Sequence, residues 1–198
     1  MQALLSKMAN DESQAPLDRR QAVQDPARAF LSEFARRAPA FTARAAGPAD
    51  EAFLYALFAA TQAEALPLPE PLVAIQFQSR RAAYAARFPD AMDLIVERRG
   101  RPIGRFMVDW SPPGYVQGVD VAVLPGERRG APGLGLMRAW AAVCDRLGKP
   151  ARLSVRPGNP ATFLYLRMGF LKVVASSVLV VMERPATPKS ISTRAGFS

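Results

Sequence analysis

The chain has 198 residues, of which 49% are hydrophobic and 22% charged, and its formal net charge is +9. This composition is typical of one globular domain with its own core. The sequence contains no histidine and one cysteine, Cys144. These counts exclude Ser-His-Asp triads, Cys-His dyads, histidine metal sites, intrachain disulfides and cysteine zinc clusters. We therefore expect a reduced, cytoplasmic protein without a metal.

The positive charge comes almost wholly from arginine, since the only lysines are Lys7, Lys149, Lys172 and Lys189. The excess favours an anionic partner, although high-GC codon usage would produce it as well. The arginines are scattered, without a helix-turn-helix spacing, zinc motif or RNA-recognition signature, so we expect no nucleic-acid partner. The longest apolar runs have the length of strands, and MQALLSKMANDESQ lacks the features of a secretory signal. We therefore expect no membrane association.

Three segments differ in their pattern. Residues 1–38 form a mostly polar N-terminal extension, residues 39–185 carry regular periodicity and form the main domain, and residues 186–198 form a Pro/Ser/Thr-rich tail that we expect to be mobile.

The extension contains one predicted helix. Asp25 suits the N-cap and Pro26 the first helical position, and Phe30 and Phe34 mark one face of a helix that ends near Arg37. This helix packs either on its own domain or on a partner, and the first is the commoner outcome.

The period of hydrophobic residues predicts the order β, α, α, β, β, β, α, β, α, β, β for the main domain. Asp50 is expected to cap the first of these helices, and Cys144 lies on the buried stripe of the third, so we expect it in the core. The strands are expected at 40–46, 92–99, 103–110, 115–124, 151–155, 170–175 and 177–183, and the helices after Asp50, after LPLPEP, at 132–147 and at 159–168.

The stretch Val119–Gly135, VDVAVLPGERRGAPGLG, joins an alternating apolar strand, a basic glycine-rich turn and the start of an amphipathic helix. A turn of small residues lets backbone N–H groups point outward, and the helix adds its unpaired first-turn donors and its dipole. Arg128 and Arg129 place positive charge beside these donors. The stretch therefore predicts a site for phosphate.

The element order, this stretch and NPATFLYLRMGF together resemble the GCN5-related N-acetyltransferase (GNAT) superfamily, as a bacterial-type domain, over residues 40–184. The resemblance implies an α/β (α+β) fold with a mixed, mostly antiparallel sheet of six or seven strands. It also implies that the fourth and fifth strands splay apart and that acetyl-CoA, as cosubstrate, lies in the V between them. The pyrophosphate would rest on the turn into the helix at 132–147.

The resemblance also implies cofactor contacts. In the family's loop pattern, Gln/Arg-x-x-Gly-x-Gly/Ala, Gly133 allows close backbone approach and Gly135 lets the helix begin beside the ligand. Here Gly130 stands where Gln or Arg is usual, and Pro132 removes one donor. The implied contacts are Val121, Ala122 and Val123 with pantetheine, Arg128, Arg129, Gly130, Ala131, Gly133, Leu134 and Gly135 at the phosphate loop, and Asn159 and Tyr165 in the final motif.

In that final motif the resemblance gives Tyr165 the role of protonating the departing thiolate. A phenol with a pKa of about 10 holds its proton at neutral pH and can yield it to a nascent thiolate. The alternative is that Leu164, Tyr165 and Met168 only pack a helix on the sheet and that Gly169 caps it.

The general base is less evident. Ribosomal-protein N-terminal acetyltransferases of the family carry a glutamate on the fifth strand, and Ser154 corresponds to it here. Asp120 on the fourth strand is our candidate base, with Asp109 and Glu97 as reserves, and water is the alternative. Each carboxylate could equally be a solvated strand residue. A deprotonated amine would attack the thioester carbonyl directly, with a strand N–H near Val121 polarising the oxygen.

Two functions are compatible with these observations. The first is transfer of an acetyl group from acetyl-CoA to a primary amine of a small molecule, or of a protein or peptide. The alternative is a non-catalytic acyl-CoA-binding or protein-interaction module on the same fold, because the phosphate loop is irregular and no base is evident. The resemblance implies that acceptor contacts come from residues 53–78 and 175–180. The oligomeric state is open, a homodimer included.

Overall fold

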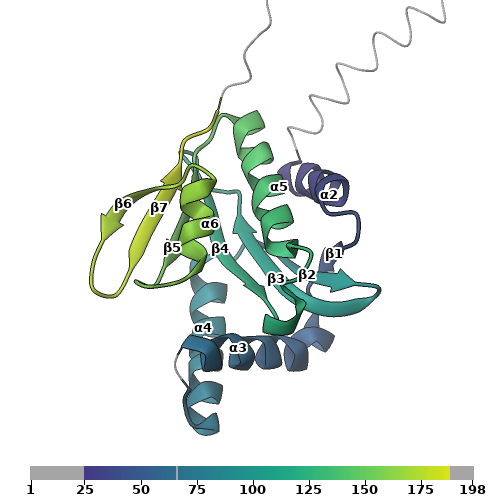
Figure 1. Ribbon diagram of the computed structural model, residues 1–198, viewed down its shortest axis with the longest axis vertical. Helices are drawn as coiled ribbons and strands as arrows, with labels where there is room; N and C mark the ends of the chain where they lie inside the picture. Colours follow the sequence, from purple (N-terminus) through teal and green to yellow (C-terminus); the bar gives the residue numbers. More distant parts are fainter. Residues whose placement is uncertain (1–24, 66, 188–198) are drawn as a thin grey trace, which may run out of the picture.

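A computed structural model describes residues 25–65 and 67–187 of the protein (Figure 1). Predictions for residues 1–24 and for the tail beyond 187 lie outside the described residues. Within the described ranges, no helix has both the length and the apolar character that a membrane crossing requires. The elements are α2 (Pro26–Arg37), β1 (Thr42–Ala45), η1 (Pro48–Asp50), α3 (Glu51–Ala65), α4 (Glu70–Arg87), β2 (Met92–Arg98), β3 (Arg101–Asp109), β4 (Val116–Val123), η2 (Pro125–Glu127), α5 (Pro132–Leu147), β5 (Ala151–Val155), α6 (Ala161–Arg167), β6 (Leu171–Ala175) and β7 (Val180–Arg184).

The strands form one seven-stranded sheet in the order β1-β2-β3-β4-β5-β7-β6. The described sheet is antiparallel except between β4 and β5, which are parallel. Helices α2, α5 and α6 join the main core with the sheet, whereas α3 and α4 pack on each other and form a smaller cluster (Figure 1). The predicted element order and the mostly antiparallel sheet are confirmed.

A β-bulge in β4 separates β4 from β5. Met107 of β3 lies opposite Asp120, but the next residue, Val108, lies opposite Gly118, so Val119 is an extra residue in β4. A bulge bends a strand and increases its twist. The pairing of β4 with β5 ends at the same point, at Gly118 and Leu153, although both strands continue beyond it. The predicted V between these strands is therefore present.

Trp140 of α5 lies beneath the point where the two strands diverge. Its side chain is fully buried, and a Cβ atom added to Gly118 would lie 2.8 Å from its Cη2 atom. Only a glycine lets the β4 backbone rest on this indole. The same face of α5 buries Cys144, and burial, followed by the charge of Asp145, raises the pKa of that thiol to about 12. Cys144 is a core residue, as its position on the helix predicted.

Helix α2 packs on its own domain. The Asp25 carboxylate accepts the N–H of Arg28 at 2.9 Å and caps the helix, and Phe30 and Phe34 are completely or almost completely buried. A Cβ atom added to Gly135 would lie 2.7 Å from the Cβ of Ala38, which follows α2. Gly135 therefore lets α2 approach α5, and its sequence-based role, a helix start beside the ligand, stays a prediction.

Element bounds agree with the prediction for α5 and β5 and differ elsewhere by a few residues. Helix α6 is shorter than predicted at both ends. Strand β7 begins three residues after the predicted start at 177, because the Ser176 hydroxyl accepts the N–H groups of Val178 and Leu179 at 3.3 and 3.1 Å in the hairpin turn.

Asp50 differs from its predicted role as the cap of α3. Its buried carboxylate accepts two hydrogen bonds from the Arg44 guanidinium, at 2.8 and 2.7 Å, and the N–H of Gly47 at 2.8 Å. Asp50 thus holds the turn that precedes α3 against β1. Its hydrogen-bond partners, Arg44 and Gly47, come before α3 in the chain, so they are not N–H groups of the helix.

We predict that Gly135→Ala lowers the free energy of unfolding by about 1–3 kcal/mol, because the new methyl group would have to displace α2. Gly133→Ala in the same helix is the matched control. A Cβ at Gly133 would meet nothing within 4 Å, and alanine favours the helix by up to about 1 kcal/mol. Urea unfolding of both variants measures the difference. Equal stability of the two would contradict the proposed contact of Gly135 with α2.

Candidate functional site

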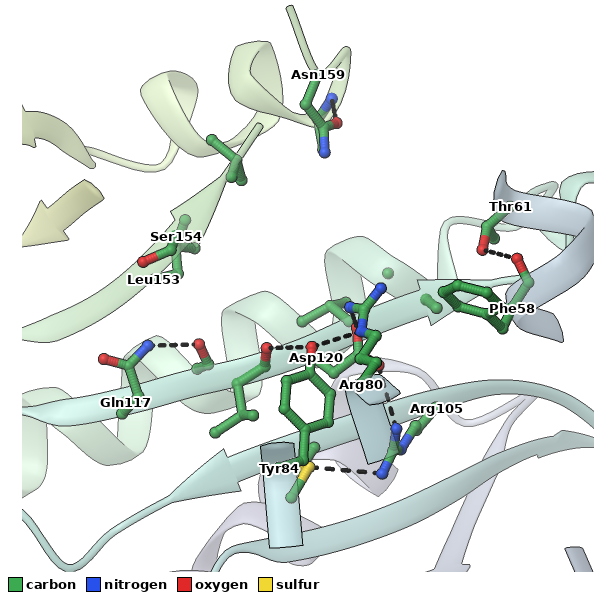
Figure 2. Close-up of a pocket in the computed structure, with 18 of the residues that line it drawn as sticks. Phe58, Thr61, Arg80, Tyr84, Arg105, Gln117, Asp120, Leu153, Ser154 and Asn159 are labelled. Atoms are coloured by element: carbon green, nitrogen blue, oxygen red, sulfur yellow. Dashed lines mark hydrogen bonds and ion pairs between the residues drawn. The ribbon is translucent and has the colours of Figure 1, made fainter. Parts of the chain in front are cut away.

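A cleft of about 2250 Å³ opens where β4 and β5 diverge. Gln117 and Asp120 lie on its β4 side, and Ser154 and Asn159 lie across from them on the β5 and α6 side (Figure 2). Most of the residues predicted to bind cofactor line this cleft, and three do not. Those in the lining are Val121, Ala122, Val123, Arg128, Ala131, Gly133, Leu134, Asn159 and Tyr165; those outside it are Arg129, Gly130 and Gly135.

The β4 segment Val121–Val123 offers main-chain groups to the cleft. On one side it pairs with β3, through Phe106, Arg105 and Gly104. Its other edge has separated from β5, and an unpaired strand edge presents N–H and C=O groups that can bind an extended chain. The predicted pantetheine contacts therefore lie on an open edge.

The start of α5 presents backbone donors at the end of this edge. Ala131, with φ +55°, precedes the helix, and no side chain caps its first turn. Gly135 donates its N–H to the Ala131 carbonyl at 3.1 Å, which leaves the first-turn N–H groups of Gly133 and Leu134 outside the helical pattern. Open space in front of Gly133 suits this end for an anion.

Contacts with β2 and α3 hold the loop that precedes α5. Arg98 of β2 donates to the Arg129 carbonyl and to the Glu127 carboxylate, the latter at 2.7 Å. Gly130 has φ +83°, and a Cβ there would lie 3.2 Å from the same guanidinium. Arg129 and Gly130 thus lie against β2 and outside the cleft. Arg128 lines the cleft but is paired with Glu64 of α3 at 2.6 Å.

Asn159 and Tyr165 come from the segment that carries α6. The Asn159 Oδ1 accepts the N–H of Ala161 at 2.9 Å and begins the helix, so its Nδ2 can serve a ligand. Tyr165 is 7% exposed and packs on Phe170 with ring centroids 5.8 Å apart, and it also lines the cleft. The packing role and the functional role that the sequence left open are thus compatible. Burial, followed by the charge of Asp120, raises the pKa of Tyr165 to about 12.

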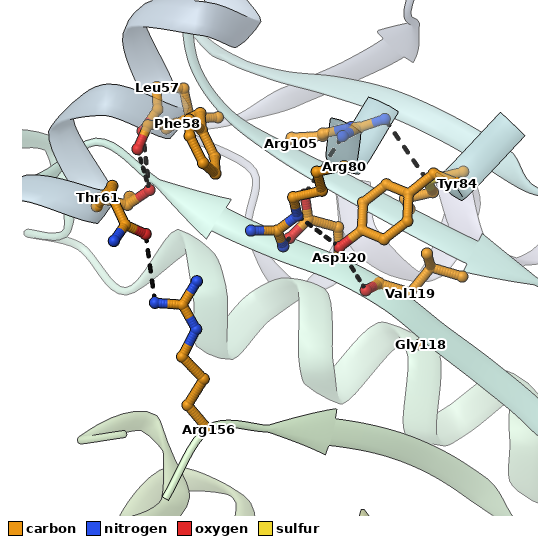
Figure 3. Close-up of polar contacts among 12 residues, drawn as sticks. Leu57, Phe58, Thr61, Arg80, Tyr84, Arg105, Gly118, Val119, Asp120 and Arg156 are labelled. Atoms are coloured by element: carbon orange, nitrogen blue, oxygen red, sulfur yellow. Dashed lines mark hydrogen bonds and ion pairs between the residues drawn. The ribbon is translucent and has the colours of Figure 1, made fainter. Parts of the chain in front are cut away.

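Asp120 lies in the cleft between two arginines (Figure 3). Its Oδ1 accepts Nη2 of Arg80 at 2.9 Å, and its Oδ2 accepts Nη1 of Arg105 at 3.3 Å. Arg80 also donates from Nε to the Tyr84 hydroxyl at 2.7 Å, and that hydroxyl donates to the carbonyl of the bulged residue Val119 at 3.5 Å. Both oxygens of the Asp120 carboxylate are thus engaged by arginines, and its role as general base stays a prediction.

The sequence analysis missed this network. Arg80 and Tyr84 are four residues apart and therefore lie on one face of α4, a spacing that could have marked them as a pair. Their partners, Arg105 and Asp120, lie on two different strands. No local sequence pattern indicates that these two residues contact α4.

The remaining carboxylates of the cleft are also paired. Glu51 pairs with Arg81, Glu64 with Arg128, and Asp93 with Arg105. In the described ranges, every carboxylate that lines the cleft is thus held by an arginine.

The two reserve bases and Ser154 complete the set of sequence-based candidates. Glu97 is bound to Arg44 at 2.8 Å, and Asp109 is buried and accepts the N–H of Ser111 at 2.9 Å. Neither is in the cleft lining, whereas the exposed side chain of Ser154 is.

No protein-family model matches this sequence, and no curated protein matches it. Solved structures do share its fold. The PaiA N-acetyltransferase of Thermoplasma acidophilum, in complex with coenzyme A, is 14% identical with a TM-score of 0.55 over 73% of this chain and 98% of that chain. The ribosomal-protein-S18-alanine N-acetyltransferase of Escherichia coli is 16% identical with a TM-score of 0.52 over 80% of this chain and 99% of that chain. A GCN5-related N-acetyltransferase of Rhodopseudomonas palustris is 19% identical with a TM-score of 0.53 over 73% of this chain and 94% of that chain.

These likenesses confirm the predicted fold: the chain has the GNAT fold. The open sheet with its diverging β4 and β5 is the feature of this fold that forms the cleft.

We predict that the stability of the protein falls between pH 10 and pH 12 in part through Tyr165. The raised pKa of Tyr165, about 12, means that the folded protein keeps the phenol proton while the unfolded chain loses it near pH 10. The stability present below pH 10 is therefore lost as the pH rises, by roughly 2–3 kcal/mol for a shift of two units. Tyr165→Phe should show a shallower decline in urea unfolding at pH 9, 10 and 11.

Cys144 has a raised pKa as well, but it contributes equally to both proteins, so the comparison isolates Tyr165. Parallel declines in the two proteins would show that burial does not hold the phenol in its protonated form.

Proposed function

We propose that this chain is an acetyl-CoA-dependent N-acetyltransferase that acts on a primary amine. One observation carries the proposal: the open edge of β4 and the uncapped first turn of α5, joined by η2 and a short loop, line the same cleft. Main-chain partners for an extended arm and donors for a pyrophosphate therefore lie along one cleft. The PaiA structure with the same fold contains coenzyme A, which supports this assignment.

The residues present fit such a ligand. The unpaired edge of Val121–Val123 would bind the amide groups of the pantetheine arm, and the N–H groups of Gly133 and Leu134 would bind phosphate together with Arg128. Asn159 would contribute its Nδ2 donor from the opposite wall. Bound acetyl-CoA supplies an acetyl thioester, which is an electrophile for an amine.

The protein's own groups would act on the two ends of the reacting bond. A β4 N–H near Val121 would stabilise negative charge on the carbonyl oxygen, and the Tyr165 hydroxyl would donate a hydrogen bond to the departing sulfur. A thiol has a pKa of about 8.5, well below the value of about 12 for Tyr165. Because the phenol is the weaker acid, we infer that Tyr165 stabilises the thiolate by hydrogen bonding rather than by complete proton transfer.

We further propose that Asp120 is a positioning residue and that water takes the amine proton. The two ion pairs hold Arg80 and Arg105 at the β4 wall, and Arg80 in turn fixes Tyr84 against the bulge. A carboxylate engaged in this way orients the two arginines and stabilises the shape of the cleft.

A non-catalytic acyl-CoA-binding module is the second candidate. The observation in its favour is that each carboxylate lining the described cleft is already paired with an arginine. Binding would need only the β4 edge and the start of α5.

Calorimetry with acetyl-CoA, followed by an assay of thiol release on a panel of primary amines, tests the proposed function. We expect binding and turnover, with Tyr165→Phe lowering kcat by about 10–100-fold while acetyl-CoA affinity stays within about twofold, because the hydroxyl acts on the departing thiolate.

Binding without turnover on any amine would favour the binding module, and failure to bind acetyl-CoA would refute both functions. Unchanged turnover in Tyr165→Phe would remove this residue from the mechanism.

For Asp120→Asn, we expect a fall in kcat/KM of about tenfold and a pH–rate profile between pH 7 and pH 10 whose shape is unchanged. The variant loses the ion pairs that position Arg80 and Arg105, but it loses no base. Steady-state rates across this range are the measurement. Loss of the rise toward alkaline pH in the variant would restore Asp120 as the general base.

A further inference from the structure

A smaller opening of about 410 Å³ leads off the cleft between α4 and the end of β5. Phe58, Arg80, Val155 and Arg156 line both the opening and the cleft, so the two spaces are continuous. We call this smaller space the side opening. Arg80 also contacts Asp120 on β4, so the side opening adjoins the wall where the acetyl group is proposed to lie.

The charged lining of the side opening is entirely positive. Arg80 and Arg156 are its charged residues, and its described lining includes no carboxylate. Arg80 shares its charge with Asp120. Arg156 extends from the end of β5 toward α3 (Figure 3), where its Nη1 donates to the Oε1 of Gln62 at 3.3 Å.

The partner of Arg156 is neutral. Gln62 is buried, at 6% exposure, so it holds the guanidinium in place without neutralising it. Within residues 25–65 and 67–187, Arg156 makes no ion pair. Of the other arginines that line the cleft, only Arg87 shares this property; the rest, Arg80, Arg81, Arg105, Arg128 and Arg152, are paired with carboxylates. An oriented, uncompensated guanidinium at the wall of a pocket is suited to bind a carboxylate or phosphate.

The rest of the lining is uncharged: Gln76, Ser79 and Ser154 are polar, and Phe58, Ile75, Val155 and Leu179 are apolar. Phe58 lies at its inner end, and Ile75 and Leu179 at its rim are 61% and 42% exposed. Exposed apolar side chains around a charged group indicate a ligand that has an apolar portion next to its anion. A polyamine, which is cationic at every nitrogen, would meet the wrong charge here.

We propose that the side opening is the acceptor subsite and that it takes a small primary amine that also bears a carboxylate or phosphate, with Arg156 as the residue that recognises the anion. This assignment rests on the proposed function, since it names the acceptor class of the same site. The apolar side chains at the rim accept the hydrocarbon part of the molecule.

Binding of matched amines to the isotopically labelled protein, followed by NMR titration, tests the subsite without requiring turnover. Leucine and leucinamide differ in the carboxylate, and O-phosphoethanolamine and ethanolamine differ in the phosphate. We expect the anionic member of at least one pair to bind tenfold or more tightly than its neutral partner, and the preferred pair identifies the anion. Arg156→Gln should reduce that preference to threefold or less.

Arg138→Gln is the control variant. Arg138 is exposed on α5 and is absent from the lining of both spaces, so its substitution removes one positive charge and should leave the preference unchanged. Equal binding of both members in both pairs would overturn the proposal. It would also be overturned if Arg156→Gln weakened acetyl-CoA and left the amines unaffected, because Arg156 would then serve the cosubstrate.

Failure of the proposed subsite can be distinguished from failure of the proposed function. Selective binding of the anionic amines without acetyl-CoA binding would retain the subsite and refute the transferase. Efficient acetylation of ethanolamine and leucinamide, unaffected by Arg156→Gln, would retain the transferase and refute the subsite.

Discussion

The divergence of β4 from β5 is the constraint on which the rest of the site depends. It begins at the extra residue Val119, and a bulge of this kind turns a strand away from its neighbour. Two contacts from opposite sides hold it: Trp140 packs beneath Gly118, and Tyr84 donates to the Val119 carbonyl. A regular pairing of the two strands would close the cleft and use up the β4 edge that is offered to a ligand.

The carboxylates of the cleft are all paired with arginines. Seven arginines and four carboxylates line it, and each of these carboxylates is engaged by an arginine. Carboxylates in this arrangement act as anchors that orient guanidinium groups. Because the arginines outnumber the carboxylates, the lining has a net positive charge. Low-dielectric walls concentrate the resulting electrostatic potential in the cleft. The same potential would attract the phosphates of a coenzyme and an anionic acceptor.

Much of the fold could be predicted because the signals are local. Pro132 at a helix start and Gly148 after its end define α5 to the residue, and alternation defines β4 and β5. The proposed phosphate contacts of Gly133 and Leu134 come from the same local reasoning. The role of Gly135 could not be predicted, because its close contact with Ala38 joins segments almost a hundred residues apart. Asp120 was placed in the cleft from its strand, but its role depends on Arg80 and Arg105, which the fold alone brings to it.

Tyr165 shows how burial both enables and limits the catalytic role that we propose for it. Its ring belongs to the main core and packs on Phe170, so the hydroxyl is held in a defined place at the cleft wall. The same burial, with Asp120 nearby, favours the protonated phenol. A group that keeps its proton this firmly is well suited to donate a hydrogen bond and poorly suited to give the proton away. Because the carboxylates of the cleft are also committed to arginines, we propose that the described site orients and stabilises charge and that solvent takes the amine proton.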